Sequence, residues 1–310
     1  MKTTYKVILV IALIFVVGIF LWALFAPKET ISNRIQQTLK EQEQRADLSF
    51  KDVTFEEVVA AVKYWQLKAK SAMVNKSSEV ATLKEVNGTF FKNGKAVLAF
   101  ISPIALWDMK TKEILLDNPL GQGSGYSFKA DNLSWKLADQ KLFCSGGIII
   151  NRGEAIGYAD ELKSDVGLET ITLQGHPKIT IAPKGFSTLT LEADVFEVIS
   201  ADNSIVAKGN PRITWREAKI HSGKIRYKQK NNVIELAGDV GIDYKDIQAW
   251  GNTALYKPED GSIILAGKAR AEQGENKLNG DEVIVSLKEQ KISVRGRGKV
   301  IITEEDLITP

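Results

Sequence analysis

The sequence predicts an all-β, elongated domain built from repeats of about 29 residues, with one transmembrane helix at its N-terminus. Glycines that recur with separations of 29, 34, 29, 29 and 29 residues indicate the repeat. Apolar residues two positions apart within each repeat indicate strands, and a continuous apolar run near the N-terminus indicates the helix. The marker glycines are Gly146, Gly175, Gly209, Gly238, Gly267 and Gly296.

The apolar run covers residues 7–25, which is long enough to cross a bilayer as a helix. Lys2 and Lys6 precede it and no acidic residue does, so the positive-inside rule places the N-terminus in the cytoplasm. A cleaved signal peptide is the alternative. The run is longer than the usual core of a signal peptide, and Pro27 stands where cleavage would have to fit. We therefore predict an uncleaved anchor, residues 1–27, in a single-pass inner-membrane protein.

Residues 28–49 form a polar segment between this anchor and the first strand-like sequence. Ile31, Ile35 and Leu39 stand four residues apart, which favours a membrane-proximal stalk helix. A flexible linker is the alternative, and a stripe of three residues is too narrow to predict a partner helix.

Each marker glycine is expected to lie inside a strand and to let that strand fold over into a V, because it lacks the Cβ that would clash at a sharp bend. The one longer separation is assigned to a five-residue insertion around residues 182–188, where Pro183 and Gly185 indicate a turn. A fainter seventh unit is predicted before the others, with Ile104 and Leu106 in the register of Leu133 and Trp135.

A second marker stands 15 residues before each glycine. Its aspartates and asparagine are expected to serve as turn residues that bind their own backbone. A ladder of calcium sites is the alternative, and it is disfavoured because two of the six positions are not carboxylates. The second markers are Asp131, Asp160, Asp194, Gly223, Asn252 and Asp281.

Composition excludes several classes of function. The 41 basic and 38 acidic residues give a net charge of +3, which is too even to indicate nucleic-acid binding. Cys144 is the single cysteine, so no intrachain disulfide can form. The two histidines, His176 and His221, lie far apart without companion cysteines. We therefore predict no metal site, no cofactor and no catalytic residue.

Stacked repeats bring equivalent apolar residues into continuous columns, which would line a trough shaped for acyl chains. A closed core uses the same residues, and from periodicity alone the core is the better supported alternative. The residues predicted to line a lipid groove are Leu133, Trp135, Leu142, Ile150, Ile171, Leu173, Ile179, Ile205, Ile213, Trp215, Ile225, Ile234, Leu236, Ile242, Ile263, Leu265, Ile292 and Val294.

Several motifs resemble a known family, and they agree in order over residues 50–180. They are the N-terminal anchor, the strand Trp65-x-Leu67-x-Ala69, the turn Asn93-Gly94, and the runs 130–147 and 157–160. Together they are similar to LptC, the membrane-anchored component of periplasmic lipopolysaccharide transport. Residues 50–185 would form the LptC-like β domain. Residues 186–310 would form a continuous extension of repeats like those of OstA/LptA.

The resemblance implies a V-shaped antiparallel β-jellyroll whose open edge strands join neighbouring modules into a bridge. It implies that the acyl chains of lipopolysaccharide ride in the interior. The implied partners are an inner-membrane ABC transporter of the LptBFG type and a periplasmic LptA/OstA-type protein. Most of the chain would then lie in the periplasm. LptC proteins are shorter than this chain, so the added repeats depart from the family pattern.

Two other functions remain open from the sequence. A parallel β-helix enzyme acting on polysaccharides also has repeats of similar length, but the densest acidic stretch, residues 154–165, contains no acid/base pair at a defensible spacing. A structural or adhesive envelope protein would share the repeats and the anchor without carrying lipid. We predict a transport component that is not an enzyme.

Overall fold

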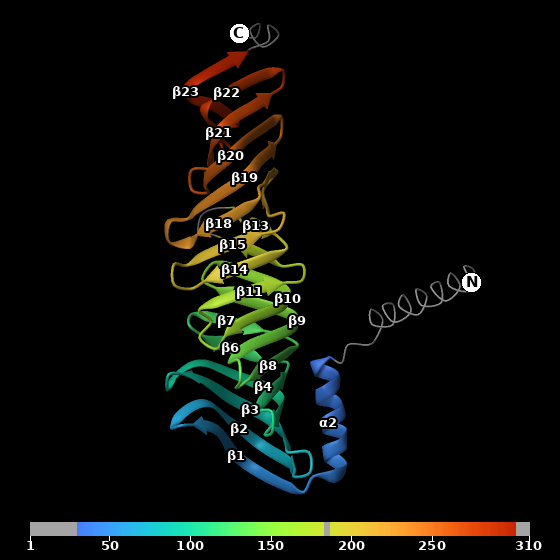
Figure 1. Cartoon of the computed structure of the whole chain (residues 1–310). Coiled ribbons are helices and arrows are strands. Elements are labelled where there is room, and N and C mark those ends of the chain that lie inside the picture. Colours follow the sequence, from blue (N-terminus) through green and yellow to red (C-terminus); the bar gives the residue numbers. More distant parts are fainter. Residues whose placement is uncertain (1–29, 183–186, 302–310) are drawn as a thin grey trace, which may run out of the picture.

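The computed structural model describes residues 30–182 and 187–301 of the chain. It is a tall column of β-strands, with strand β1 at one end, strand β23 at the other, and helix α2 alongside the N-terminal part (Figure 1). The predicted anchor, residues 1–27, lies outside the described residues. Helix α2 falls short of the length and apolar character that a bilayer span needs, and no other described helix meets that standard.

The described residues contain one α-helix, one short 3₁₀-helix and 23 strands. The helices are α2 Ile31–Arg45 and η1 Gln229–Asn231. The strands are β1 Leu48–Val59, β2 Val62–Asn75, β3 Val80–Lys92, β4 Lys95–Asp108, β5 Glu113–Asp117, β6 Leu120–Gly123, β7 Tyr126–Lys129, β8 Asn132–Lys136, β9 Lys141–Arg152, β10 Ala155–Asp165, β11 Thr170–Gln174, β12 Lys178–Ile181, β13 Leu189–Glu192, β14 Val195–Ile199, β15 Ser204–Lys208, β16 Arg212–Trp215, β17 Ala218–His221, β18 Lys224–Lys228, β19 Val233–Tyr244, β20 Ile247–Lys257, β21 Ser262–Gln273, β22 Asn276–Ser286 and β23 Lys291–Ile301.

Pairing between strands is antiparallel throughout the described sheet, from β1–β2 to β22–β23. The all-β, elongated, antiparallel class predicted from the sequence is therefore confirmed, and a parallel β-helix is excluded. Two consecutive bent strands make one repeat, since Gly238 in β19 and Gly267 in β21 stand 29 residues apart. The predicted division between residues 50–185 and 186–310 stays a prediction, and β12 pairs with β13 on either side of it.

In the middle of the column each rung is divided into two half-strands, so the sheet has two arms. We call the half-sheet that contains β5, β8, β11, β14, β15 and β18 the first arm. The half-sheet that contains β6, β7, β12, β13, β16 and β17 is the second arm. The long strands β9, β10 and β19 cross from one arm to the other, which holds the arms together at the bend.

The marker glycines mark this bend. All six have a left-handed backbone, with φ between 71° and 84°, a region that favours glycine. Gly146, Gly238, Gly267 and Gly296 lie inside strands as predicted, whereas the strand is interrupted at Gly175 and Gly209.

The second-marker residues pack against the marker glycines, which is not the role predicted for them. They lie directly against the marker glycines, so that a Cβ built on Gly209 would come within 2.3 Å of Asp194 Oδ2. The backbone amide of Asp194 also donates to the Gly209 carbonyl at 2.9 Å. The two columns found in the sequence are therefore the two sides of one corner, and the predicted turn within each aspartate's own backbone is wrong.

The predicted seventh unit is out of register by one residue. Ala105 pairs with Leu116, which pairs with Leu133, so Ala105 is the residue that continues the inward column. Ile104 and Leu106 face the opposite side of the sheet, where helix α2 lies. Apolar residues occur on both faces here because both faces are covered.

Helix α2 packs on the outer face of the first arm instead of forming a free stalk or a linker. Ile35 is buried against Leu106 and Leu115, with Ile31 and Leu39 beside it. Thr30 is the N-cap of the helix, and its side-chain hydroxyl accepts a hydrogen bond from the Asn33 backbone amide at 3.3 Å. Arg34 pairs with Glu113 at 2.9 Å, and Gln42 donates to the Val80 carbonyl at 3.0 Å. The three-residue stripe is therefore wide enough to dock the helix.

Candidate functional site

The candidate site is the space between the two arms. Sixteen of the eighteen predicted groove residues are buried there, and Ile292 and Val294 in the last strand are partly buried. The structure thus gathers the predicted columns into one continuous apolar interior. Whether these residues bind lipid stays a prediction.

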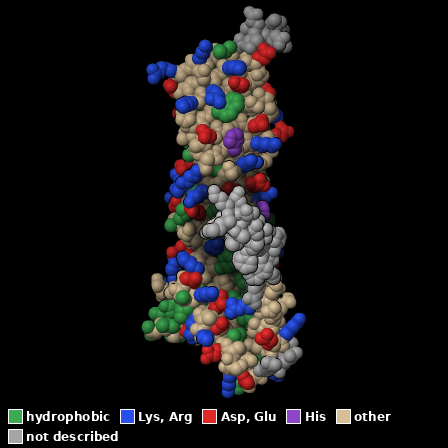
Figure 2. Space-filling model, turned by 45° about the vertical axis from the view of Figure 1, so that its right-hand side comes forward, with side chains coloured by type: hydrophobic (Ala, Val, Ile, Leu, Met, Phe, Trp, Pro, Cys, Tyr) green, Lys and Arg blue, Asp and Glu red, His purple; other side chains and the backbone are tan. Residues whose placement is uncertain are grey.

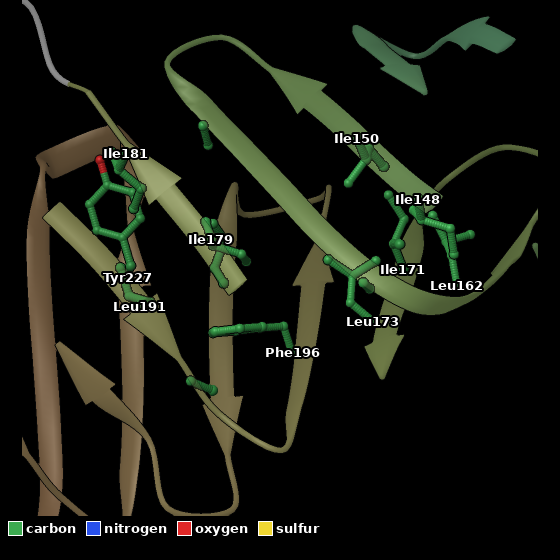
Figure 3. Close-up of a cluster of buried hydrophobic side chains, with 14 of the residues drawn as sticks. Ile148, Ile150, Leu162, Ile171, Leu173, Ile179, Ile181, Leu191, Phe196 and Tyr227 are labelled. Carbon is green, nitrogen blue, oxygen red and sulfur yellow. The ribbon is translucent and has the colours of Figure 1, made fainter. Parts of the chain in front are cut away.

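Side chains from both arms interlock at the centre of the column. Ile179, Ile181 and Leu191 extend from the second arm, and Phe196 and Tyr227 extend from the first arm (Figure 3). Glycines in the second arm make room for this contact: a Cβ on Gly157 would lie 3.1 Å from Leu173 Cδ1. The sequence pattern does not reveal this role, because a glycine between apolar residues also suits a bulge.

The open side of the V is bridged by polar contacts between the tips of the two arms. Tyr126 of the second arm hydrogen-bonds Ser200 of the first at 3.1 Å, and Arg152 donates to Asn203 Oδ1 at 2.5 Å. Arg152 also donates to the Tyr126 hydroxyl and stacks over its ring. Ser124 donates to the Gly167 carbonyl at 2.9 Å.

Similar bridges continue toward both ends of the column. Lys92 pairs with Asp165 at 2.8 Å and with Glu169 at 2.7 Å, and these bonds raise the pKa of Lys92. Lys112 pairs with Glu57 at 3.2 Å near the N-terminal end. Near the C-terminal end, the Tyr244 hydroxyl donates to the Leu287 carbonyl at 3.0 Å. We call this series of contacts the cross-arm seam.

The seam residues lie in turns and at strand ends, where the repeat has no fixed pattern. No periodic signal in the sequence could have found them. Their effect is to close the side of the interior that the V-shaped interpretation left open.

Little space remains inside the closed interior. A cavity of about 30 Å³ lies next to Tyr126, Ile150 and Leu173, enough for about one or two water molecules. Burial also raises the pKa of the Cys144 thiol to about 12, as expected of a side chain inside a dry core. The closed-core alternative therefore describes the interior in this structure, and an acyl chain could enter only if the arms moved apart.

The two ends of the column differ from its centre. No described strand pairs with the outer edge of β1 or of β23, so each edge presents unpaired backbone groups. Val300 and Ile301 on β23 are exposed, as are Leu48 and Phe50 on β1. Both edges could accept a further strand.

The described residues contain no candidate metal-binding site. No group of three His, Cys, Asp or Glu side chains is placed there as a metal site would require. His176 lies at the surface, with its Nδ1 2.9 Å from Asp160 Oδ2.

Comparisons with known proteins find similarity over part of the chain. No curated protein sequence matches the chain. Among solved structures, the chain is similar to that of LptH from Pseudomonas aeruginosa, the LptA homologous periplasmic component of the conserved lipopolysaccharide transport device. That similarity has 19% identity and a TM-score of 0.35, and it covers 37% of this chain and 94% of LptH. Residues 190–291 match the family model of the LptA/(LptD N-terminal domain) LPS transport protein. This match supports the predicted resemblance to lipopolysaccharide-transport proteins, but not to LptC specifically.

Proposed function

We propose that this chain is a bridge component of lipopolysaccharide transport, held in the inner membrane by residues 1–27 with its strands in the periplasm. It would accept lipopolysaccharide from an ABC transporter of the LptBFG type. It would pass the lipid along the space between the arms toward the outer membrane. An LptA/OstA-type protein would receive it.

One observation carries this proposal. The residues that match the lipopolysaccharide-transport family model, 190–291, include three successive members of an apolar column at an unbroken 29-residue spacing. Ile205, Ile234 and Ile263 succeed one another along the first arm and are buried in turn. A path of this kind would keep each CH₂ group of an acyl chain out of water, which avoids a cost of about 0.8 kcal/mol per group.

The proposed transport needs no catalytic residue on this chain, but it needs the arms to separate. The cross-arm seam is made of single hydrogen bonds, each contributing about 0.5–1.5 kcal/mol or more where a charged group takes part, and of partly exposed ion pairs, each contributing about 1 kcal/mol or less. The differential affinity of the open state for lipid, together with work from the transporter, would have to exceed the free energy of these contacts and of the interior packing.

Edge strands are the proposed docking surfaces. Backbone groups along β1 and β23 are available for strand addition, in which main-chain hydrogen bonds supply the affinity. The two strands contain 12 and 11 residues, so either edge offers a long ladder.

Site-specific photo-crosslinking in cells tests the proposal. A benzoylphenylalanine placed at Ile292, in the partly buried last rung, or at Ile234, in the closed interior, should capture lipopolysaccharide. The matched control is Lys219, which is exposed on the outer face of β17. Lipopolysaccharide captured equally at Lys219 and Ile292 would contradict an interior path. Capture at neither position would favour the structural or adhesive alternative.

Opening of the interior can be followed with the single native cysteine. Cys144 should react very slowly with a maleimide at pH 7, because its thiol is buried and its pKa is raised. Replacing Arg152 by alanine removes its contacts with Tyr126 and Asn203 and should accelerate labelling several-fold. Arg295→Ala, which affects an exposed pair with Glu282 on one arm, serves as the control. Equal rates in the two variants would mean that the seam does not gate the interior.

A further inference from the structure

The outer face of the second arm carries an apolar stripe that nothing in the described chain covers. Ile101 and Leu120 face each other across the β4–β6 pair, and they are 50% and 51% exposed. Successive strand pairings continue this row from Leu120 through β7 and β9 to Tyr158 in β10, which is 40% exposed. On the first arm, by contrast, helix α2 covers the outward-facing Leu106 and Leu115.

The stripe lies in a hollow and not on a flat surface. β4 and β6 pair over only three residues, and Gly123 packs so tightly on the Val97 backbone that a Cβ there would meet its carbonyl oxygen. The β4–β6 ladder ends at Ala99, and beyond the close contact at Val97 the tips of β1–β4 spread away from the column (Figure 1). The hollow formed there has a volume of about 720 Å³, within the usual range of small-molecule sites.

Charges around this hollow have one sign. Its only charged lining residues among those described are Lys68 and Lys129. They bracket the apolar pair in one cross-strand row, Lys68–Asn87–Ile101–Leu120–Lys129. Within the described ranges, neither lysine lies within ion-pair distance of a carboxylate. Lys68 also lines the adjoining hollow, where Lys70 pairs with Glu85, and its charge helps to lower the pKa of Glu56.

The same row changes character in the C-terminal half of the second arm. There its members are Glu192, Arg212 and His221, and no large apolar side chain of these strands is exposed. The space-filling view, turned by 45° from Figure 1, shows charges of both signs scattered along the column and a group of hydrophobic side chains toward its N-terminal end (Figure 2). An apolar floor with cationic ends is thus a local feature and not a property of the repeat.

We propose that this hollow binds one phosphorylated acyl lipid on the outside of the sheet, with a chain against Ile101 and Leu120 and a phosphate at Lys68 or Lys129. An anion satisfies the lysines, and an acyl chain removes the exposed apolar surface from water. A second copy of this chain is a poorer occupant, because a symmetric contact would bring the lysines of both copies together. The proposal rests on the proposed function, since it gives the lipid a site while the seam keeps the interior closed.

A titration of the full chain in nanodiscs of phosphatidylcholine tests the site. An environment-sensitive fluorophore is attached to Ser127→Cys, an exposed position in the lining, while Cys144 stays buried. Dihexanoyl phosphatidic acid should produce a saturable change in emission, and dihexanoyl phosphatidylcholine should produce little. The double variant Lys68→Gln/Lys129→Gln should weaken the affinity at least tenfold. Leu120→Ser should also weaken it, whereas Lys219→Gln on the same outer face should not.

Three results would overturn the proposal. They are equal responses to the two lipids, an affinity unchanged by the double lysine variant, and saturable binding of an acidic amphipathic peptide with no response to phosphatidic acid. Circular dichroism of each variant establishes that it is folded. Photo-crosslinking at Ile292 distinguishes the two proposals. Absence of lipopolysaccharide capture at Ile292 would contradict the interior transport path, whereas absence of the fluorescence response at Ser127→Cys alone would contradict only the outer site.

Discussion

Strands β1–β4 at the N-terminal end of the column and β19–β23 at the C-terminal end are all long, antiparallel and bent near their middle. The bends are made by different residues. In β19, β21 and β23 a marker glycine takes the left-handed conformation, whereas in β1 and β3 the left-handed residues are Asp52 and Glu85. One architecture can therefore be reached with or without the glycine signature.

The cores of the two regions differ as well. In the N-terminal region Phe90 packs against Phe100 and Trp135, with ring centroids 5.1 and 5.4 Å apart, and Trp65 meets Trp107 edge-on at 5.0 Å. In the C-terminal region the core consists mainly of aliphatic columns such as Ile234 and Ile263. The core of the N-terminal region therefore depends on particular aromatic contacts, whereas the core of the C-terminal region repeats the same aliphatic packing from one repeat to the next.

Replacing Phe90 by alanine should have the largest effect on stability. Its side chain is fully buried and contacts two aromatic rings, so we expect a loss of about 3–5 kcal/mol in the free energy of unfolding. Ile263→Ala should cost about 2–4 kcal/mol, and Val300→Ala, at an exposed position, less than about 0.5 kcal/mol. Urea unfolding in mild detergent, with hydrogen exchange to locate the change, measures these differences. Equal losses for Phe90→Ala and Val300→Ala would show that the aromatic cluster is not a packed core.

The glycine corner can be tested with two matched variants. Gly209→Ala and Gly238→Ala both force alanine into a left-handed conformation, which costs about 1–2 kcal/mol. Gly209→Ala also brings its Cβ within 2.3 Å of Asp194 Oδ2, whereas a Cβ on Gly238 would lie 3.6 Å from Gly223 Cα, an ordinary van der Waals contact. We therefore expect Gly209→Ala to cost about 1 kcal/mol more than Gly238→Ala.

A third variant extends this test to the other region. Glu85→Gly removes backbone strain but adds the entropy of glycine in the unfolded chain, so its net effect should be within about 0.5 kcal/mol of zero. Thermal unfolding of the three variants measures the differences. A loss for Glu85→Gly as large as that for Gly209→Ala would mean that the Glu85 side chain, and not the backbone, sets the N-terminal bend.

These differences explain what the sequence could and could not predict. The repeat, its strands and its inward columns were predicted wherever a glycine marks the corner, from Gly146 to Gly296. The register failed in the unit before residue 130, because its corner residue, Asn118, takes the left-handed conformation without being a glycine. Ile104 and Leu106 were placed in the core because they are apolar, but their partner is a helix distant in sequence. The seam and the outer hollow depend on how the arms twist together, which the order of residues along one strand does not encode.

Docking of α2 distinguishes the N-terminal region further, since the structure places no α-helix on the C-terminal strands it describes. Ile35→Ala removes the buried centre of the helix contact and should destabilise that contact by about 2 kcal/mol. Hydrogen exchange should accelerate in α2 and in the neighbouring part of β5, and stay unchanged in β19–β22. Gln36→Ala, at a position exposed on the same helix, is the control. Faster exchange throughout the column would show that α2 supports the whole fold.

The smallest expected effect concerns the seam under acid. Burial of the Asp165 carboxyl works to raise its pKa, but the bonds from Lys92 and from the Glu169 amide outweigh burial, so the pKa is lowered. A carboxyl with a lowered pKa stabilises the folded state above its unfolded pKa of about 3.9, and this stabilisation is lost as the pH falls through the folded value. The C-terminal end of the seam depends on the hydrogen bond from the Tyr244 hydroxyl to the Leu287 carbonyl, which involves no carboxyl group.

Comparison of the wild type with Lys92→Gln isolates this contribution. Because Lys92 is partly exposed, the difference in unfolding free energy should be below about 1 kcal/mol at pH 6. It should shrink steadily below pH 4, as Asp165 becomes protonated and the wild type loses the ion pair that the variant already lacks. A matched Tyr244→Phe variant should show a difference from wild type that does not change between pH 6 and pH 3. If the difference in unfolding free energy between the wild type and Lys92→Gln also stayed constant, the ion pair would not hold the arms together. The cross-arm seam near Lys92 would then depend on packing alone.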